Sequence, residues 1–176
     1  SWQKSLLERG QGEGPKQKKS ELKLRFVEAG KADESLDVPE ARARRHLRVG
    51  DLLWGRNHPV AAAREYELGQ RFAPGDPILA SRVARASLSR GQADRALGAV
   101  EAALNDHPHH APLWALKGQA LLALGRDAEA ASALRESIRQ NPFDPSPHCN
   151  LTRASRDPSE KAKEQRSCQL LGGTSN

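Results

Sequence analysis

The sequence has little or none of several features that mark whole classes of protein. Its only cysteines, Cys149 and Cys168, are too few and too far apart for a zinc cluster or a disulfide framework, and they leave the compartment open between cytoplasmic and extracytoplasmic. No run of about 18 apolar residues occurs, so no membrane span is predicted. Aromatic residues make up only 4% of the chain, whereas Ala and Leu are plentiful, a composition typical of helices that pack through small contacts.

Methionine is absent, and the chain begins SWQKSLLERG without a charged and then apolar signal sequence. We therefore expect a fragment or a processed product from which targeting information has been lost. Whether a catalytic domain precedes Ser1 stays open. The length of 176 residues suits one domain, or one domain with an arm.

Basic residues exceed acidic ones, which gives a formal net charge of +6 and a pI near 9.7. The excess is spread thinly along the chain. A nucleic-acid binder usually gathers its basic groups on one face or arm, often beside aromatic residues that stack on bases. No nucleic-acid partner is therefore expected, and RNA binding by a basic helical surface is the weakest alternative.

Three consecutive blocks of 34 residues align without a gap, which indicates an internal repeat. The blocks span residues 43–76, 77–110 and 111–144. A proline falls at the same place near the end of each block, at Pro74, Pro108 and Pro142. Apolar residues within each block keep helical spacing. One column holds large residues that are expected in the core, namely Tyr66, Val100 and Leu134.

Small residues recur where two helices would have to approach closely. They form two columns: Gly50, Ala84 and Gly118, and then Ala62, Ala96 and Ala130. A third column holds residues that tolerate the left-handed conformation ending a helix, namely Asn57, Gly91 and Gly125. Each block is therefore predicted to be a helix, a tight turn and a second helix. Neighbouring hairpins must stack, because one hairpin cannot bury its apolar faces alone.

The third block resembles the tetratricopeptide repeat (TPR), a helix-turn-helix unit of the same length. The residues that match the family's pattern are Trp114, Gly118, Leu121, Gly125, Ala130, Leu134 and Pro142. The resemblance implies an all-α, TPR-type helix-turn-helix repeat solenoid.

The array is expected to cover residues 41–171, because a partial fourth repeat follows residue 144. Pro158 then breaks the repeat register. We interpret the segment that it begins as a polar C-terminal capping helix that covers the open end of the stack, with Leu170 and Leu171 as its buried edge. Residues 172–176 are expected to be a flexible tail.

Residues 1–40 differ in composition from the repeats. They begin with a stretch rich in Gly, Lys and Gln, which is typical of a linker. Leu22, Leu24 and Phe26 then alternate with polar residues, as in a short strand, although a helix stays open at this length. We interpret these residues as a partly ordered linker or the exit from a preceding domain.

Asp106, His107, His109 and His110 form the densest group of potential metal ligands. The repeat register places them in the turn between two repeats, where Pro108 ends the helix. Zinc sites need three or four preorganised ligands, which an exposed turn does not offer. No metal site is therefore predicted here.

No catalytic motif for hydrolysis, metal catalysis or phosphate binding occurs. His148 and Cys149 are neighbours on a predicted helix and point about 100° apart, so they do not suit a nucleophile and its base. Neither an enzyme activity nor a cofactor is expected.

The TPR resemblance implies a concave groove lined by the first helix of each repeat. The residues expected to bind a partner there are Arg44, Arg48, Trp54, Arg82, Arg85, Leu88, Gln119, Leu122 and Arg153. Arginine presents a planar fork that suits carboxylates, so an acidic and apolar peptide or helix is the expected ligand. The Lys and Asn residues with which the family clamps a terminal carboxylate are not reproduced, so a chaperone tail is not favoured.

The sequence therefore predicts a non-catalytic protein-protein interaction module, a scaffold or adaptor. An alternative is the C-terminal docking or regulatory tail of a larger bacterial enzyme, such as a metallopeptidase, which the unusual first 40 residues suggest. A groove with only a structural role also stays open, because most exposed arginines bind nothing. The identity of the partner and the oligomeric state are not predicted.

Overall fold

The computed structural model describes residues 38–174. Residues 42–176 form one compact unit, and the account that follows is of that unit, together with the first turn of the helix that leads into it. The strand predicted at Leu22, Leu24 and Phe26 lies outside the described residues, as does the rest of the predicted linker before residue 38.

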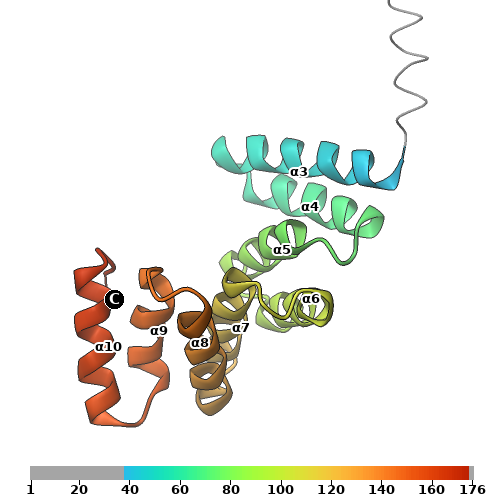
Figure 1. Ribbon diagram of the computed structural model, residues 1–176. Helices are drawn as coiled ribbons and strands as arrows, with labels where there is room; N and C mark the ends of the chain where they lie inside the picture. The colour runs from blue at the N-terminus through green and yellow to red at the C-terminus, as the bar shows by residue number, and fades with distance from the viewer. Residues whose placement is uncertain (1–37, 175–176) are drawn as a thin grey trace, which may run out of the picture. The chain divides into compact units, whose positions relative to one another are not determined.

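All regular elements in the described part are helices (Figure 1). They are α3 (Pro39–Gly55), α4 (Pro59–Phe72), α5 (Pro77–Ser89), α6 (Ala93–Asp106), α7 (Ala111–Ala123), α8 (Asp127–Gln140), α9 (Pro145–Ala154) and α10 (Pro158–Leu170). Each predicted block holds one pair of helices, and α9 and α10 form a fourth pair. The prediction of an all-α helical repeat solenoid is confirmed.

Local sequence explains where the helices begin and end. The Asp76 and Asp144 carboxylates accept hydrogen bonds from main-chain N–H groups in the first turns of α5 and α9, just before a proline that suits a first helical position. The predicted turn column adopts positive φ in all three repeats: 61° at Asn57, 70° at Gly91 and 72° at Gly125. These turns reverse the chain within each repeat.

The small residues of the first helices let the second helices approach closely. A Cβ atom at Gly118 would lie 2.5 Å from Cγ of Leu134, and one at Gly50 would overlap the Tyr66 ring. Tyr66, Val100 and Leu134 are all buried, as predicted, with exposed fractions of 1% or less. The large core residues Tyr66 and Leu134 of the second helices therefore pack against the small residues of the first helices, Gly50 and Gly118.

The interpretation of the two cysteines was wrong. Cys149 of α9 and Cys168 of α10 form a disulfide, although 19 residues separate them. The two helices are joined by the short turn after Ala154 and pack against each other. Separation along the chain is therefore no measure of distance across a helical hairpin.

The prediction that Leu170 and Leu171 form a buried edge of α10 was wrong for Leu170, whose side chain is 87% exposed, whereas Leu171 is half-buried. The helix instead buries Glu164 and Cys168. The Glu164 carboxylate contacts Nδ1 of His148, whose Nε2 lies 3.0 Å from the carbonyl oxygen of Pro142. The last helix is therefore held by a buried polar pair and a disulfide rather than by an apolar edge.

An ion pair also attaches α10 to α8. Nε and Nη2 of Arg135 each donate to a carboxylate oxygen of Glu160 at 2.7 Å, and the Ser155 hydroxyl donates to the same carboxylate. The hydrogen bonds from Arg135 and then Ser155 lower the pKa of Glu160 from 4.5 to about 2. The lowered pKa means that the ionised carboxylate stabilises the fold above about pH 4.5, and that this contribution is lost as the pH falls towards 2.

Glu160→Gln is expected to lower the free energy of unfolding at neutral pH by about 0.2 to 1 kcal/mol, the range of partly exposed ion pairs. The variant should also lose less stability than the wild type between pH 5 and pH 2, since it has no carboxylate to protonate at this place. Urea unfolding at a series of pH values measures both effects. Lys161→Gln, which removes an exposed charge from the same helix and leaves every carboxylate in place, is the control and should keep the wild-type dependence on pH. Identical pH dependence of Glu160→Gln and wild type would contradict this assignment.

Candidate functional site

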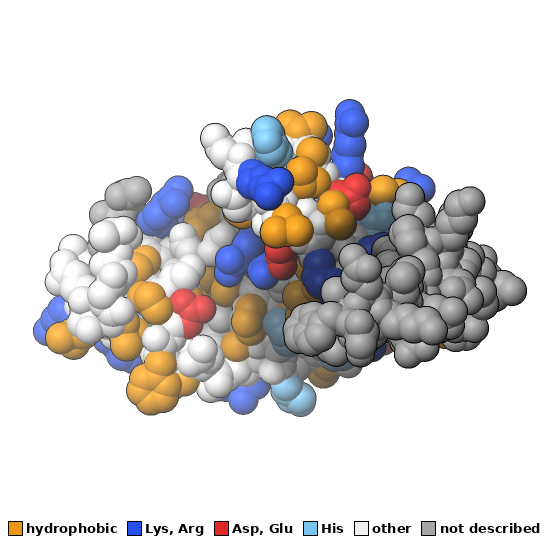
Figure 2. Space-filling model, turned by 90° about the horizontal axis from the view of Figure 1, so that it is seen from above, with side chains coloured by type: hydrophobic (Ala, Val, Ile, Leu, Met, Phe, Trp, Pro, Cys, Tyr) orange, Lys and Arg blue, Asp and Glu red, His pale blue; other side chains and the backbone are white. Residues whose placement is uncertain are grey.

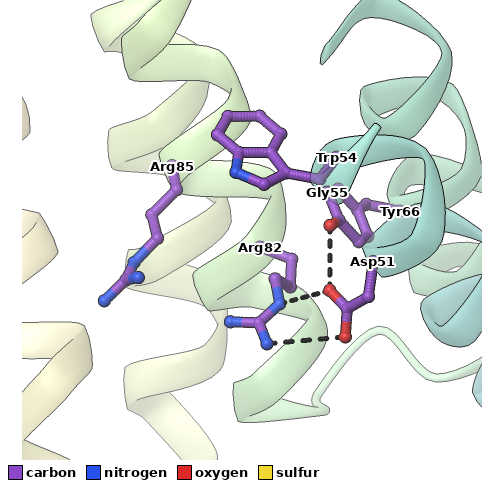
Figure 3. Close-up of a pocket in the computed structure, with 6 residues that line it drawn as sticks. All are labelled: Asp51, Trp54, Gly55, Tyr66, Arg82 and Arg85. Carbon is purple, nitrogen blue, oxygen red and sulfur yellow. Dashed lines mark hydrogen bonds and ion pairs between the residues drawn. The ribbon is translucent and has the colours of Figure 1, made fainter. Parts of the chain in front are cut away.

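A pocket of about 410 Å³ opens between α3 and α5. The residues that line it are Asp51, Trp54, Gly55, Tyr66, Arg82 and Arg85 (Figure 3). We call it the α3–α5 pocket. Three of the predicted partner-binding residues, Trp54, Arg82 and Arg85, meet here, because the first helices of repeats one and two lie next to each other.

Asp51 organises the polar side of the pocket. Its carboxylate accepts a hydrogen bond from the Tyr66 hydroxyl at 2.9 Å and from Nε of Arg82 at 2.7 Å, as the dashed lines in Figure 3 show. Burial, and then the bond to Asp51, raise the pKa of Tyr66 to about 12, so the phenol stays protonated as a donor. The Arg82 charge is thus already paired within the protein.

Arg85 and Trp54 are the pocket residues whose side chains are accessible to a ligand. Arg85 is exposed and has no ion pair with any described residue, and in Figure 3 its guanidinium points away from the Asp51–Arg82 pair. The Trp54 side chain is 41% exposed. The pocket therefore combines one uncompensated cation with an accessible aromatic surface.

Arg44 and Arg48 are exposed on α3. They lie seven and three residues before Asp51, a spacing that places them on the same side of the helix. Together with Arg85 they give this side of the array a positive charge. Figure 2, seen from above relative to Figure 1, shows basic and hydrophobic side chains interspersed on one face, with fewer acidic ones.

The remaining predicted residues lie elsewhere on the first helices. Leu88 and Leu122 are half-buried against the main core, so only part of each side chain is accessible to a partner. Gln119 donates to the hydroxyl of Ser146 at 3.0 Å and links α7 to α9. Arg153 lines a second pocket of about 370 Å³, to which Gly173 of the C-terminal tail also contributes.

Two functional features were missed from the sequence. Asp51 is not among the residues predicted to bind a partner, and Tyr66 was expected only in the core. The only sequence signal for the pairing of Asp51 with Arg82 is their opposite charge on successive first helices, because they are the ninth and the sixth residues of their blocks and no repeat column pairs them. The reach of the Tyr66 hydroxyl through the core to that carboxylate has no comparable sequence signal.

The histidine-rich segment lies between two repeats. His107 follows the last residue of α6 as its C-cap, and His110 precedes the first residue of α7. Burial, and then the nearby His107, lower the pKa of His110. Trp114 donates from Nε1 to the carbonyl oxygen of Pro108 at 2.7 Å and so anchors the turn. No cluster of three potential metal ligands occurs among residues 38–174.

Comparison with known proteins agrees with this architecture. Residues 87–149 match the tetratricopeptide repeat family model. A thermophilic TPR protein from Thermus thermophilus is 22% identical, with a TM-score of 0.64, over 73% of this chain and 72% of that protein. No curated protein sequence matches this chain. The helical hairpins define a repeat protein of the solenoid class. The described residues have the fold of a TPR array.

Two further solved structures are TPR domains with bound peptides. The second TPR domain of human RPAP3, solved with an HSP70 peptide, is 18% identical, with a TM-score of 0.63, over 68% of this chain and 99% of the domain. The first TPR of Spaghetti (RPAP3), bound to an HSP90 peptide, is 16% identical, with a TM-score of 0.57, over 76% of this chain and 96% of that one. Within the described part of this chain, no helix is long and apolar enough to cross a bilayer.

Proposed function

We propose that this array is a non-catalytic interaction module that binds a segment of another protein on the face formed by α3, α5, α7 and α9, here called the groove face. The observation that carries the proposal is the α3–α5 pocket, where an unpaired Arg85 lies beside the accessible Trp54 ring. Arginine and tryptophan are the residue types most enriched among the energetic centres of protein interfaces. The peptide complexes of the RPAP3 domains support the proposal by analogy of fold.

The charge of the groove face favours an acidic and apolar partner. Arg44, Arg48 and Arg85 are exposed and form no ion pair with described residues. A carboxylate that binds an unpaired guanidinium gains a charge-assisted hydrogen bond. Opposite charges also speed the encounter of two proteins and suppress wrong partners. Arg82 contributes less to this attraction, because Asp51 already neutralises it.

Replacement of Arg48 and Arg85 by Gln is expected to weaken partner binding about tenfold, which corresponds to about 1.4 kcal/mol. The partner would first be captured from cells of the source organism on the intact chain, then purified and titrated by calorimetry. Arg64→Gln with Arg166→Gln removes the same charge from exposed positions of α4 and α10 and should leave the affinity unchanged. Equal affinities of the two double variants would refute the assignment of the groove face.

A further inference from the structure

We propose that the α3–α5 pocket recognises one internal Asp or Glu side chain of the partner together with an adjacent aromatic side chain. The carboxylate binds Arg85 and the ring packs on Trp54. This inference rests on the proposed function, because it assigns the chemistry of one point on the groove face.

The charges of the lining residues favour the binding of a single carboxylate from the partner. Arg82 and Asp51 form an ion pair with Nε 2.7 Å from Oδ1, so their charges cancel locally. Arg85 is then the single uncompensated charge among the lining residues. A second carboxylate would have to approach Asp51, and two like charges held close together repel each other. Asp51 therefore acts as a specificity-determining residue.

The apolar side of the pocket suits a ring. Trp54 is 41% exposed, and apart from the two chain neighbours and the helix backbone no atom lies within 4 Å of the place where a Cβ of Gly55 would be. Both residues line the pocket, so it reaches the C-terminal end of α3. A volume of about 410 Å³ lies within the range of pockets that hold compact ligands. An aromatic side chain can pack on the indole in an offset or edge-on arrangement.

An internal acidic side chain fits better than a chain end. The groove face continues beyond the pocket, towards Arg48 on α3 and towards the Gln119–Ser146 contact between α7 and α9. A bound segment can therefore pass through the pocket and continue on both sides. An acidic residue at the C-terminus of the partner would bring two carboxylates, one from its side chain and one from the chain end. The residues that line the pocket offer only one unpaired cation, Arg85.

Short capped peptides test the recognition directly on the full chain. The probes are acetyl-Phe-Glu-amide, acetyl-Phe-Gln-amide, acetyl-Ala-Glu-amide and acetyl-Gln-Phe with a free carboxylate. Titrations followed by the NMR signal of the Trp54 indole N–H give the affinity of each probe. The acidic aromatic probe is expected to bind at least about fivefold more tightly than each of the other three, since it alone makes both contacts in the proposed arrangement.

Variants separate the two contacts. Arg85→Gln should remove the preference for Glu over Gln, whereas Arg64→Gln should keep it. Gly55→Leu places a side chain in open space and should block every probe while the helical circular dichroism is unchanged. Asp51→Asn frees Arg82 and should improve binding of acetyl-Glu-Phe-Glu-amide over acetyl-Phe-Glu-amide.

Several outcomes would overturn the proposal: no shift of the Trp54 signal with any probe, equal binding of all four probes, or a Glu preference that survives Arg85→Gln. Tighter binding of the free-carboxylate probe would show that the pocket takes a chain end. If the probes fail while Arg48→Gln with Arg85→Gln still weakens the natural partner, the pocket chemistry is wrong and the groove-face function stands. If the probes behave as expected but the partner is unaffected, the proposed function is wrong instead.

Discussion

Leu134→Ala is expected to lower the free energy of unfolding by about 2 to 5 kcal/mol, the cost of removing a fully buried leucine from a packed core. The Leu134 side chain is 0% exposed and belongs to the larger of the two core clusters. It packs against Gly118 of the preceding helix, which has no side chain that could fill the space that Ala would leave. Urea unfolding followed by helical circular dichroism measures the loss.

A double-mutant cycle tests whether Leu134 and Gly118 contribute to stability through their direct contact. Gly118→Ala alone is expected to cost about 1 to 3 kcal/mol, because its methyl group would lie 2.5 Å from Cγ of Leu134. In the Leu134→Ala background the same methyl group enters vacated space, so the double variant should lose less than the two single losses added together. Gly98→Ala on α6 meets no atom within 4 Å and should be neutral or stabilising. Additive losses would contradict the packing described here.

Removing the Cys149–Cys168 disulfide is expected to cost about 3 kcal/mol, as estimated from the entropy of closing a loop of this length. The loss should fall on α9 and α10, because the bond joins only these two helices. In hydrogen exchange, amides of α10 should exchange faster in Cys149→Ser with Cys168→Ser than in wild type, while those of α5 change little. Reductant should reproduce the effect in wild type and have none in the double serine variant.

The last helix, α10, depends on this bond because it buries no large apolar side chain. The residues that α10 buries are Glu164 and Cys168, and its exposed Leu170 contributes no burial. A helix of this composition gains little from the hydrophobic effect when it packs. Unchanged protection of α10 amides without the disulfide would mean that the His148–Glu164 pair and the Arg135–Glu160 pair suffice to hold it.

The repeat architecture could be predicted because its marks are local and occur three times. The residue types at Asn57, Gly91 and Gly125 were enough to predict the turns, because Asn and Gly tolerate the positive φ that these residues adopt. Gly118 and Leu134 stand a fixed number of residues apart, so their contact follows once the hairpin is inferred. Spacing along the chain therefore carried the information.

Contacts between side chains of different helices could not be predicted in the same way. The Cys149–Cys168 bond and the 87% exposure of Leu170 depend on how α10 is rotated against α9. The repeat pattern ends at Pro158, so it gives no information about how α10 is rotated. The Asp51–Arg82 pair depends likewise on the distance between two first helices. Arg82, which was predicted to bind a partner, instead forms an ion pair within the protein.

Site-specific photo-cross-linking in cells of the source organism tests the groove face most directly. A photoreactive amino acid replaces Ile78 on α5, which lies four residues before Arg82 and is 51% exposed, or Val60 on α4, which is 53% exposed. The two positions match in exposure, and both leave the arginines intact. The account predicts one dominant adduct with a partner protein from position 78 and none from position 60. The same adduct from both positions, or an adduct from position 60 alone, would contradict it.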